Sequence, residues 1–248
     1  MQLRELRGVL LPYFFPVSFS RIPLLGNRAM VAVDSHGGVA LKAPTAVAPS
    51  SFVWGVSTAA FQVEGLRDAG ARQPSIWDAF DTPDLSKIIR AVRPSGERTI
   101  SGSVNASRCD EDYIRYKSSA NISHSLGFGA ARMSISWPRV MTYVKNVSGG
   151  MPSWTRNEAG IRHYHAVIQA YTARGLRVAL TMFHWDLPLA LEEHAAASGC
   201  GSAWLCSHWI SQAFAEYAEV LLAEFRPHVT WWITLNEPLT IVESGYAG

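Results

Sequence analysis

The 248-residue sequence predicts an α/β fold built on a parallel sheet, and three observations support this prediction. Short apolar runs suited to strands alternate with longer segments whose apolar residues recur at helical spacing. The last of these runs is almost continuously apolar, as expected for a strand buried on both faces of a parallel sheet. The composition, with 48% hydrophobic and 17% charged residues, is that of a globular protein. A barrel and an open doubly wound sheet both satisfy this pattern.

The predicted elements follow one another in the order β-α-β-α-β-α-β from residue 51 onward. We expect strands over residues 52–57, 130–136, 178–183 and 229–235. We expect helices over residues 110–126, 157–175 and 210–225. A long loop rich in Asp, Pro, Ser and Gly follows the first strand. Asn157 is the expected N-cap of the second helix, whose apolar side chains Ile161, Tyr164, Ile168 and Tyr171 share one face.

Residues 1–50 differ in character from residues 51–248, so we predict a leader or disordered extension followed by the folded domain. Arg4 and Arg7 precede the apolar stretch 9–19, an order that is typical of a secretory signal, although two prolines interrupt it. An organelle transit peptide is the alternative. Three Asn-x-Ser sequons begin at Asn105, Asn121 and Asn146 and also favour the secretory route.

Charge and cysteine content exclude several classes of protein. The net charge is +2, so no basic surface favours nucleic acid as a partner. No apolar run reaches the roughly 20 residues of a membrane span. Three cysteines exclude a disulfide-rich scaffold, although Cys200 and Cys206 are close enough to bridge or to stay as thiols. His163 and His165 are two residues apart on a helix and point to different faces, so they do not form a metal site.

Polar side chains follow the predicted strands, at the ends that share one edge of a parallel sheet. The sequence places there Gln62, Glu64, Arg132, Trp137, His184, Trp185, Asp186, Asn236 and Glu237. Amide, imidazole, guanidinium, indole and carboxyl groups at one edge suit a polyhydroxylated ligand. The main residues also have purely structural interpretations. Glu237 could cap a strand end, and His184 could be a core histidine. Trp137 and Trp185 could pack in the core, and Arg132 could pair with a buried acid.

Five sequence blocks occur in order between residues 52 and 248. The first two blocks are FVWGVSTAAFQVEG (52–65) and PSIWD (74–78). The next two are RMSISWPR (132–139) and HWDLP (184–188), and the fifth is WITLNEP (232–238). Together these blocks make the chain from residue 52 to 248 resemble glycoside hydrolase family 1, the β-glucosidase family, in which the fifth block holds the acid/base carboxyl.

The resemblance implies a (β/α)8 barrel and retaining hydrolysis of O-glycosidic bonds in β-glucosides or related sugars. It implies that Glu237 is the catalytic acid/base and that Arg132 lies beneath the nucleophile and keeps it ionised. Asn236 would then bond the sugar 2-hydroxyl. Further sugar contacts would come from Gln62, His184 and Trp185. Such an enzyme needs a second carboxylate about 5–5.5 Å from the acid, and no metal or cofactor.

The chain departs from the family at its nucleophile, because the Glu-Asn-Gly block of the seventh strand has no counterpart in this sequence. Residues 51–248 therefore resemble the first half of the barrel, about four βα units. We expect a half barrel to be inactive alone and to self-associate through its exposed sheet edges. A non-catalytic sugar-binding or receptor-like relative and an inactive truncated product are the alternatives.

Overall fold

The computed structural model describes residues 31–33, 39–41, 49, 51–81, 109–144 and 152–245. These residues fall into two units, 1–52 and 53–248, which are described separately. In the first unit β1 (Val31–Val33) pairs antiparallel with β2 (Val39–Leu41). The rest of the predicted leader and the sequons at Asn105 and Asn146 lie outside the described residues, and the division at residue 50 stays a prediction.

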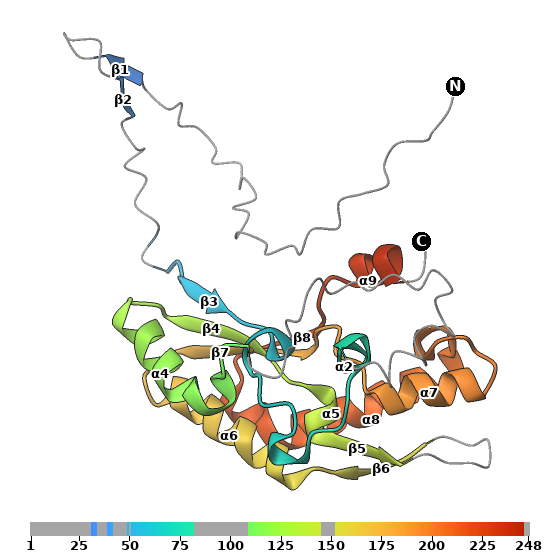
Figure 1. The fold of residues 1–248 in the computed structure, drawn as a ribbon. Coiled ribbons are helices and arrows are strands. Elements are labelled where there is room, and N and C mark those ends of the chain that lie inside the picture. The colour runs from blue at the N-terminus through green and yellow to red at the C-terminus, as the bar shows by residue number, and fades with distance from the viewer. Residues whose placement is uncertain are drawn as a thin grey trace, which may run out of the picture. The chain divides into compact units, whose positions relative to one another are not determined.

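The second unit is built on a four-stranded sheet in which every pairing is parallel. The strands, in their order across the sheet, are β3 (Gly55–Ser57), β4 (Ala130–Ser134), β7 (Arg177–Phe183) and β8 (Trp231–Leu235). Spatial order follows chain order, so each βα unit adds its strand to the same side of the sheet (Figure 1). The predicted α/β fold with a parallel sheet is confirmed.

The three predicted helices connect these strands and lie along one face of the sheet (Figure 1). They are α4 (Asp112–Ser125), α6 (Glu158–Thr172) and α8 (Ser207–Phe225). Asn157 caps α6 as predicted, because its side chain accepts hydrogen bonds from the backbone N–H groups of Ala159 and Gly160. The expected apolar stripe of α6 is buried in the core between sheet and helices.

The sheet strands begin or end at places that the apolar runs do not mark. The first expected strand starts at residue 52, but β3 starts at Gly55, because its partner β4 begins opposite it at Ala130. The expectation that the fourth strand is buried on both faces is wrong for the described residues. Trp231 of β8 is 42% exposed, since β8 pairs with β7 on one side and is an edge strand of the described sheet.

Shorter elements fill the connections, and the sequence pattern missed them because each is too short to show a period. The additional helices are α1 (Ala60–Val63), α2 (Ile76–Asp81), α5 (Trp137–Val140), α7 (Leu189–Ala197) and α9 (Pro238–Gly245). The additional strands, β5 (Met141–Val144) and β6 (Ser153–Arg156), form an antiparallel hairpin. Three 3-10 turns lie at Ala69–Ala71, Ala203–Leu205 and Arg226–His228. In the connection before α8, Cys200 and Cys206 form a disulfide with a Cα–Cα distance of 5.6 Å.

A buried ion pair fixes the connection after β3 against the helices. Nε of Arg139 donates to Oε2 of Glu64 at 3.0 Å, and Nη1 donates to the carbonyl of Ala69 at 2.6 Å. The second carboxylate oxygen of Glu64 accepts a 2.7 Å hydrogen bond from the hydroxyl of Tyr164 on α6. Burial acts to lower the pKa of Arg139, but the charge and hydrogen bond of Glu64, together with Tyr164 and Tyr113, outweigh it and hold that pKa above its ordinary value.

Close backbone contact between α5 and α6 supports the same ion pair. A Cβ atom on Gly160 would lie 1.9 Å from the carbonyl oxygen of Arg139, so only glycine fits at this position. The guanidinium of Arg139 also lies 4.4 Å from the ring centre of Tyr113 on α4. Arg139 therefore contacts both helices that cover the first half of the sheet.

A second polar cluster fixes α2 beside the connection after β7. Asp78 accepts two hydrogen bonds from Arg72, at 2.8 and 2.9 Å, and further bonds from the N–H and hydroxyl of Ser75. Ser75 forms a β-bridge with Pro188, and Ile76 N–H donates to the carbonyl of Leu187. The block at 74–78 is thus paired with the block at 184–188.

We predict that Glu64→Gln and Arg139→Met each lower the free energy of unfolding by about 3 kcal/mol, because each leaves a buried charged partner unpaired. The double variant should lose less unfolding free energy than the two single variants lose in sum, because no unpaired charge remains in it. Urea denaturation of the four proteins measures both effects.

The exposed pair Glu111–Arg115 on α4 provides the matched control. Glu111→Gln and Arg115→Met should change the unfolding free energy by less than about 1 kcal/mol. Equal losses of unfolding free energy at the two ion pairs would show that the buried pair has no special structural role.

Candidate active site

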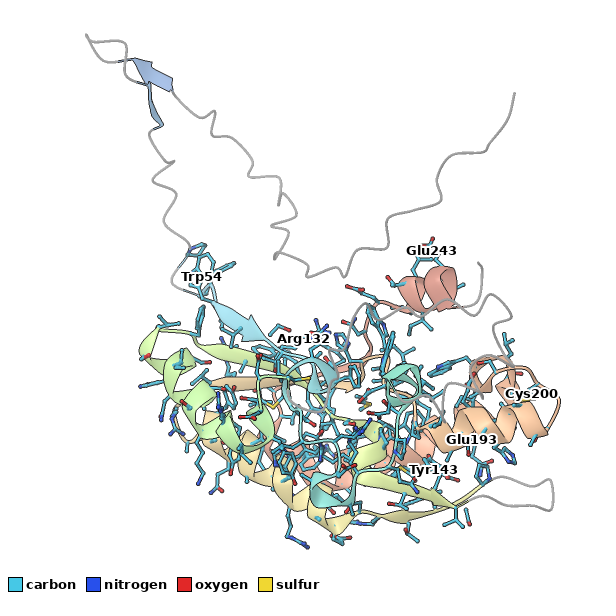
Figure 2. The ribbon with its side chains drawn as sticks, viewed as in Figure 1. Trp54, Arg132, Tyr143, Glu193, Cys200 and Glu243 are labelled. Atoms are coloured by element: carbon cyan, nitrogen blue, oxygen red, sulfur yellow. A yellow bond between two sulfur atoms is a disulfide. The ribbon has the colours of Figure 1, made fainter. Side chains whose placement is uncertain are left out.

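Hydrogen bonds from one arginine join the carboxyl ends of three neighbouring strands. Arg132 on β4 donates from Nε to the hydroxyl of Thr181 on β7 at 2.9 Å. Its Nη2 donates to Oδ1 of Asn236, directly after β8, at 2.5 Å. Alternate residues of a strand point to opposite faces, and the neighbours Ala131 and Met133 are buried toward the helices. Arg132 therefore points to the other face of the sheet (Figure 2).

The segments that follow β7 and β8 are joined directly to each other. The indole N–H of Trp185 donates to the carbonyl of Asn236 at 2.9 Å, and the N–H of Asn236 donates to the carbonyl of Phe183. Trp185 and Glu237 both have left-handed backbones, with φ of 72° and 44°. Such conformations cost energy in residues other than glycine and persist where surrounding contacts impose them, often at functional sites.

His184 lies within the electrostatic influence of the other polar groups. Burial lowers the pKa of its imidazole, and the positive charge of Arg132 lowers it further. A backbone hydrogen bond to the imidazole and the charge of Glu237 oppose these effects without cancelling them. A neutral imidazole at pH 7 can donate one hydrogen bond and accept another, as recognition of a hydroxyl group requires.

Glu237 occupies the junction between β8 and α9 and is exposed. Pro238 begins α9, a position where the fixed φ of proline suits the first turn of a helix. Glu243 lies further along α9, also exposed, on its outer side (Figure 2). The carboxylate of Glu237 is thus available to a ligand at the strand ends.

Gln62 lies exposed on α1, and no described residue forms a hydrogen bond with its side chain. The start of α1 is fixed to β4, since the N–H of Ala60 donates to the hydroxyl of Ser134 at 2.7 Å. Of the six predicted site residues, Arg132 therefore lies on β4, four directly follow β7 or β8, and Gln62 follows β3. No side-chain bond joins Gln62 to the other five within the described residues.

Three other residues that the sequence placed at this edge do not line it. Trp137 is fully buried and stacks on Tyr217 with ring centres 4.6 Å apart, as its structural interpretation expects. Glu64 belongs to the buried ion pair with Arg139. Asp186 is buried beneath the edge. Conversely, Thr181 bonds Arg132 but was not among the predicted site residues, although a hydroxyl inside an apolar strand signals a buried hydrogen-bond partner.

Asp186 is 1% exposed, and neither carboxyl oxygen accepts a hydrogen bond from a described residue. Burial raises its pKa to about 8, and the charge of Glu64 acts in the same direction. Ser136 and the backbone N–H of Asp186 lie near the carboxyl group without reaching hydrogen-bond geometry, and with the guanidinium of Arg72 they oppose this shift without cancelling it. Asp186 therefore carries a proton at neutral pH and makes no fixed charge beneath the site.

Two small cavities of about 20 and 10 Å³ lie next to α1, and both are lined by Glu64. They have room for about one water molecule, far less than a sugar ring needs.

Within the described residues, no three His, Cys, Asp or Glu side chains gather as a metal site. None of the described helices is long and apolar enough to cross a membrane.

Comparison with known proteins agrees with the fold and with the sequence blocks. The family described as "Glycosyl hydrolase family 1" matches residues 45–248. "Beta-glucosidase 14" of Arabidopsis thaliana is 36% identical over 198 residues, which are 80% of this chain and 35% of that protein. "Raucaffricine-O-beta-D-glucosidase" of Rauvolfia serpentina is 34% identical over 225 residues, which are 90% and 36% of the two chains.

Solved structures give the same result in three dimensions. A rice β-glucosidase superimposes with a TM-score of 0.62 at 34% identity, covering 80% of this chain and 36% of the rice chain. The family 1 β-glucosidase of Thermotoga maritima gives 0.61 at 33% identity, with coverages of 79% and 38%. The four-stranded sheet is therefore part of a (β/α)8 barrel, as predicted. The chain spans about a third of the length of these relatives.

We predict that Asp186→Asn stabilises the protein at pH 8 by about 2 kcal/mol and has little effect at pH 4. The folded-state pKa of about 8 lies above the ordinary 3.8, so the folded protein binds a proton that the unfolded chain releases between these values. The contribution of Asp186 to stability therefore falls as the pH rises from about 4 to about 8. Thermal melting of both proteins across this range measures the difference.

The exposed Asp110 is the control for this prediction, since Asp110→Asn should change stability by less than about 0.5 kcal/mol at either pH. The charged or titratable groups that act electrostatically with Asp186 are Glu64, Arg72 and Tyr217, and none of them is altered. A difference between Asp186→Asn and the parent that does not grow with pH would contradict a buried, protonated Asp186.

Proposed function

The chain belongs to glycosyl hydrolase family 1, and from this premise we propose that it supplies the acid/base side of a retaining β-glycosidase. The substrate class is β-glucosides or related sugars, and the bond broken is the O-glycosidic bond. The observation that carries the proposal is the cluster of Arg132, Asn236 and Trp185 beside an exposed Glu237 at the strand ends.

Glu237 is the proposed general acid/base of this reaction. In the first step it gives its proton to the glycosidic oxygen as the sugar C1–O bond breaks, and in the second it removes a proton from the attacking water. The exposed position of Glu237 after β8 leaves room for a leaving group. Its left-handed backbone directs the chain sharply from the strand into α9.

The neighbouring side chains are proposed to hold the sugar in place. The bond from Arg132 occupies Oδ1 of Asn236, which leaves the Nδ2 donor of that amide for a sugar hydroxyl. His184 and Gln62 supply further hydrogen-bond partners, and the ring of Trp185 supplies a flat apolar surface for sugar C–H groups. The remaining positive charge of Arg132 suits an adjacent carboxylate, the nucleophile that double displacement requires.

The second carboxylate of this reaction is proposed to come from outside the 248 residues. The family block Glu-Asn-Gly has no counterpart in the sequence, and Glu243 lies on the outer side of α9 (Figure 2). The edge strands β3 and β8 of the described sheet have room for further barrel strands, and in their absence we expect the chain to self-associate.

We predict that a chimera will test the role of Glu237. Residues 45–248 replace the matching segment of the Thermotoga maritima β-glucosidase, so that a complete barrel is present. The chimera should hydrolyse 4-nitrophenyl β-glucoside, and Glu237→Gln should lower the rate at least about 100-fold, the usual effect of removing a general acid. The release of nitrophenolate measures the rate.

Glu243→Gln is the matched control, because it makes the same change six residues away on the exposed side of α9. It should leave the rate within about twofold, as expected for a surface change. A folded chimera that hydrolyses the substrate equally well with Glu237→Gln would overturn the assignment of the acid/base. Binding of glucoimidazole, an inhibitor-like probe, distinguishes loss of chemistry from loss of the sugar site.

We predict that the 248-residue chain alone does not turn over the same substrate, because one carboxylate cannot perform double displacement. The measurement is nitrophenolate release by the purified chain, with Glu237→Gln as the comparison. Hydrolysis by the parent chain that disappears in Glu237→Gln would contradict the proposed need for an outside nucleophile.

A further inference from the structure

The helix α4 buries small side chains and leaves two large apolar ones exposed. Ser123 is buried and donates to the carbonyl of Ser119, and Ala120 is fully buried. The large side chains Ile114 and Ile122 are instead 60% and 57% exposed. Leu126, directly after the helix, is 67% exposed. The outward surface of α4 thus carries a few large apolar side chains among exposed polar ones such as Arg115 and Lys117.

A sequon lies at the centre of this outward surface. Asn121, Ile122 and Ser123 form the Asn-x-Ser acceptor sequence for N-linked glycans. Asn121 is exposed, and its Oδ1 accepts a 2.5 Å hydrogen bond from Nε of Arg174. No described residue forms a hydrogen bond with Nδ2, the atom to which a glycan is attached. We propose that Asn121 carries an N-linked glycan.

The modification is compatible with the contacts of the folded helix. In the transfer, a bond forms between Nδ2 and C1 of an oligosaccharide, and the C1–O bond to its lipid diphosphate carrier breaks. Nδ2 loses one proton, the lipid diphosphate leaves with the bonding electrons, and nothing is oxidised or reduced. Oδ1 is retained, so the bond from Arg174 persists. Because Ser123 is buried in the folded protein, the acceptor is used before the helix folds.

The disulfide between Cys200 and Cys206 supports the same compartment independently. Disulfides form and persist in oxidising compartments such as the lumen of the endoplasmic reticulum, and they are rare in the cytosol. N-linked glycans are transferred in that lumen. A chain that acquires this disulfide during folding is therefore exposed to the glycan donor.

A glycan at this position also covers the apolar surface. Ile114 precedes Asn121 by seven residues, about two helical turns, and lies on the same side of α4. Ile122 is the next residue. A bulky, hydrated glycan between them keeps other molecules from the exposed apolar side chains.

Translation of the full chain with endoplasmic reticulum microsomes tests the proposal. Asn105 and Asn146 are replaced by Gln so that Asn121 is the remaining sequon. We expect a mass increase that peptide-N-glycosidase removes, with conversion of residue 121 to Asp in the tryptic peptide. Asn121→Gln and Ser123→Ala should each abolish the increase, whereas Ser123→Thr, which keeps the hydroxyl, should retain it.

Ser125→Ala is the matched control, because it removes a hydroxyl of the same helix outside the sequon and should retain the full mass increase. An unmodified Asn121 peptide overturns the proposal, whether the chain fails to enter the microsomes or enters and remains unglycosylated. Modification of the unaltered chain at Asn105 or Asn146 but not at Asn121 overturns it equally.

Discussion

The buried ion pair between Glu64 and Arg139 is the interaction on which the described structure depends. It joins the connection after β3 to the connection after β4, and Tyr164 extends it to α6. A buried charge that loses its partner is strongly unfavourable, so the pair tolerates little movement of the three segments. Gly160 and the ring of Tyr113 close the space around Arg139. The ends of β3 and β4 are consequently held in one arrangement.

Residues of the five sequence blocks contact one another in the folded chain. Glu64 of the first block pairs with Arg139 of the third, and Ser75 of the second forms a bridge with Pro188 of the fourth. Arg132 and Trp185 both bond Asn236 of the fifth. Residues that are far apart in the chain thus hold each other in position at the carboxyl ends of the strands. Such coupling fixes the geometry of a site more firmly than packing alone, because hydrogen bonds are directional.

The sequence predicted the regular part of this fold and the composition of the site, but not which polar residues reach its surface. Helices such as α6 are visible because their apolar period persists over several turns, and Asn157 marks the start. Glu64 and Asn236 are equally polar in sequence, yet one is in a buried ion pair and the other bonds Arg132 at the strand ends. That difference arises from Arg139, 75 residues after Glu64. Short elements such as α1 and α5 depend on such contacts too and carry no period of their own.

The same reasoning bears on the proposed catalytic site, of which the described residues would supply one side. Arg132 satisfies Thr181 and Asn236 with two of its N–H groups and retains further donors and a full positive charge. The opposing acid at the strand ends, Glu237, is exposed and makes no ion pair with it. The hydrogen-bond partners of the Arg132 cation are neutral. An anionic group placed beside it would therefore gain charge-assisted hydrogen bonds. The charge of Arg132 therefore suits an adjacent carboxylate, which is the role that the proposed double displacement gives to its nucleophile.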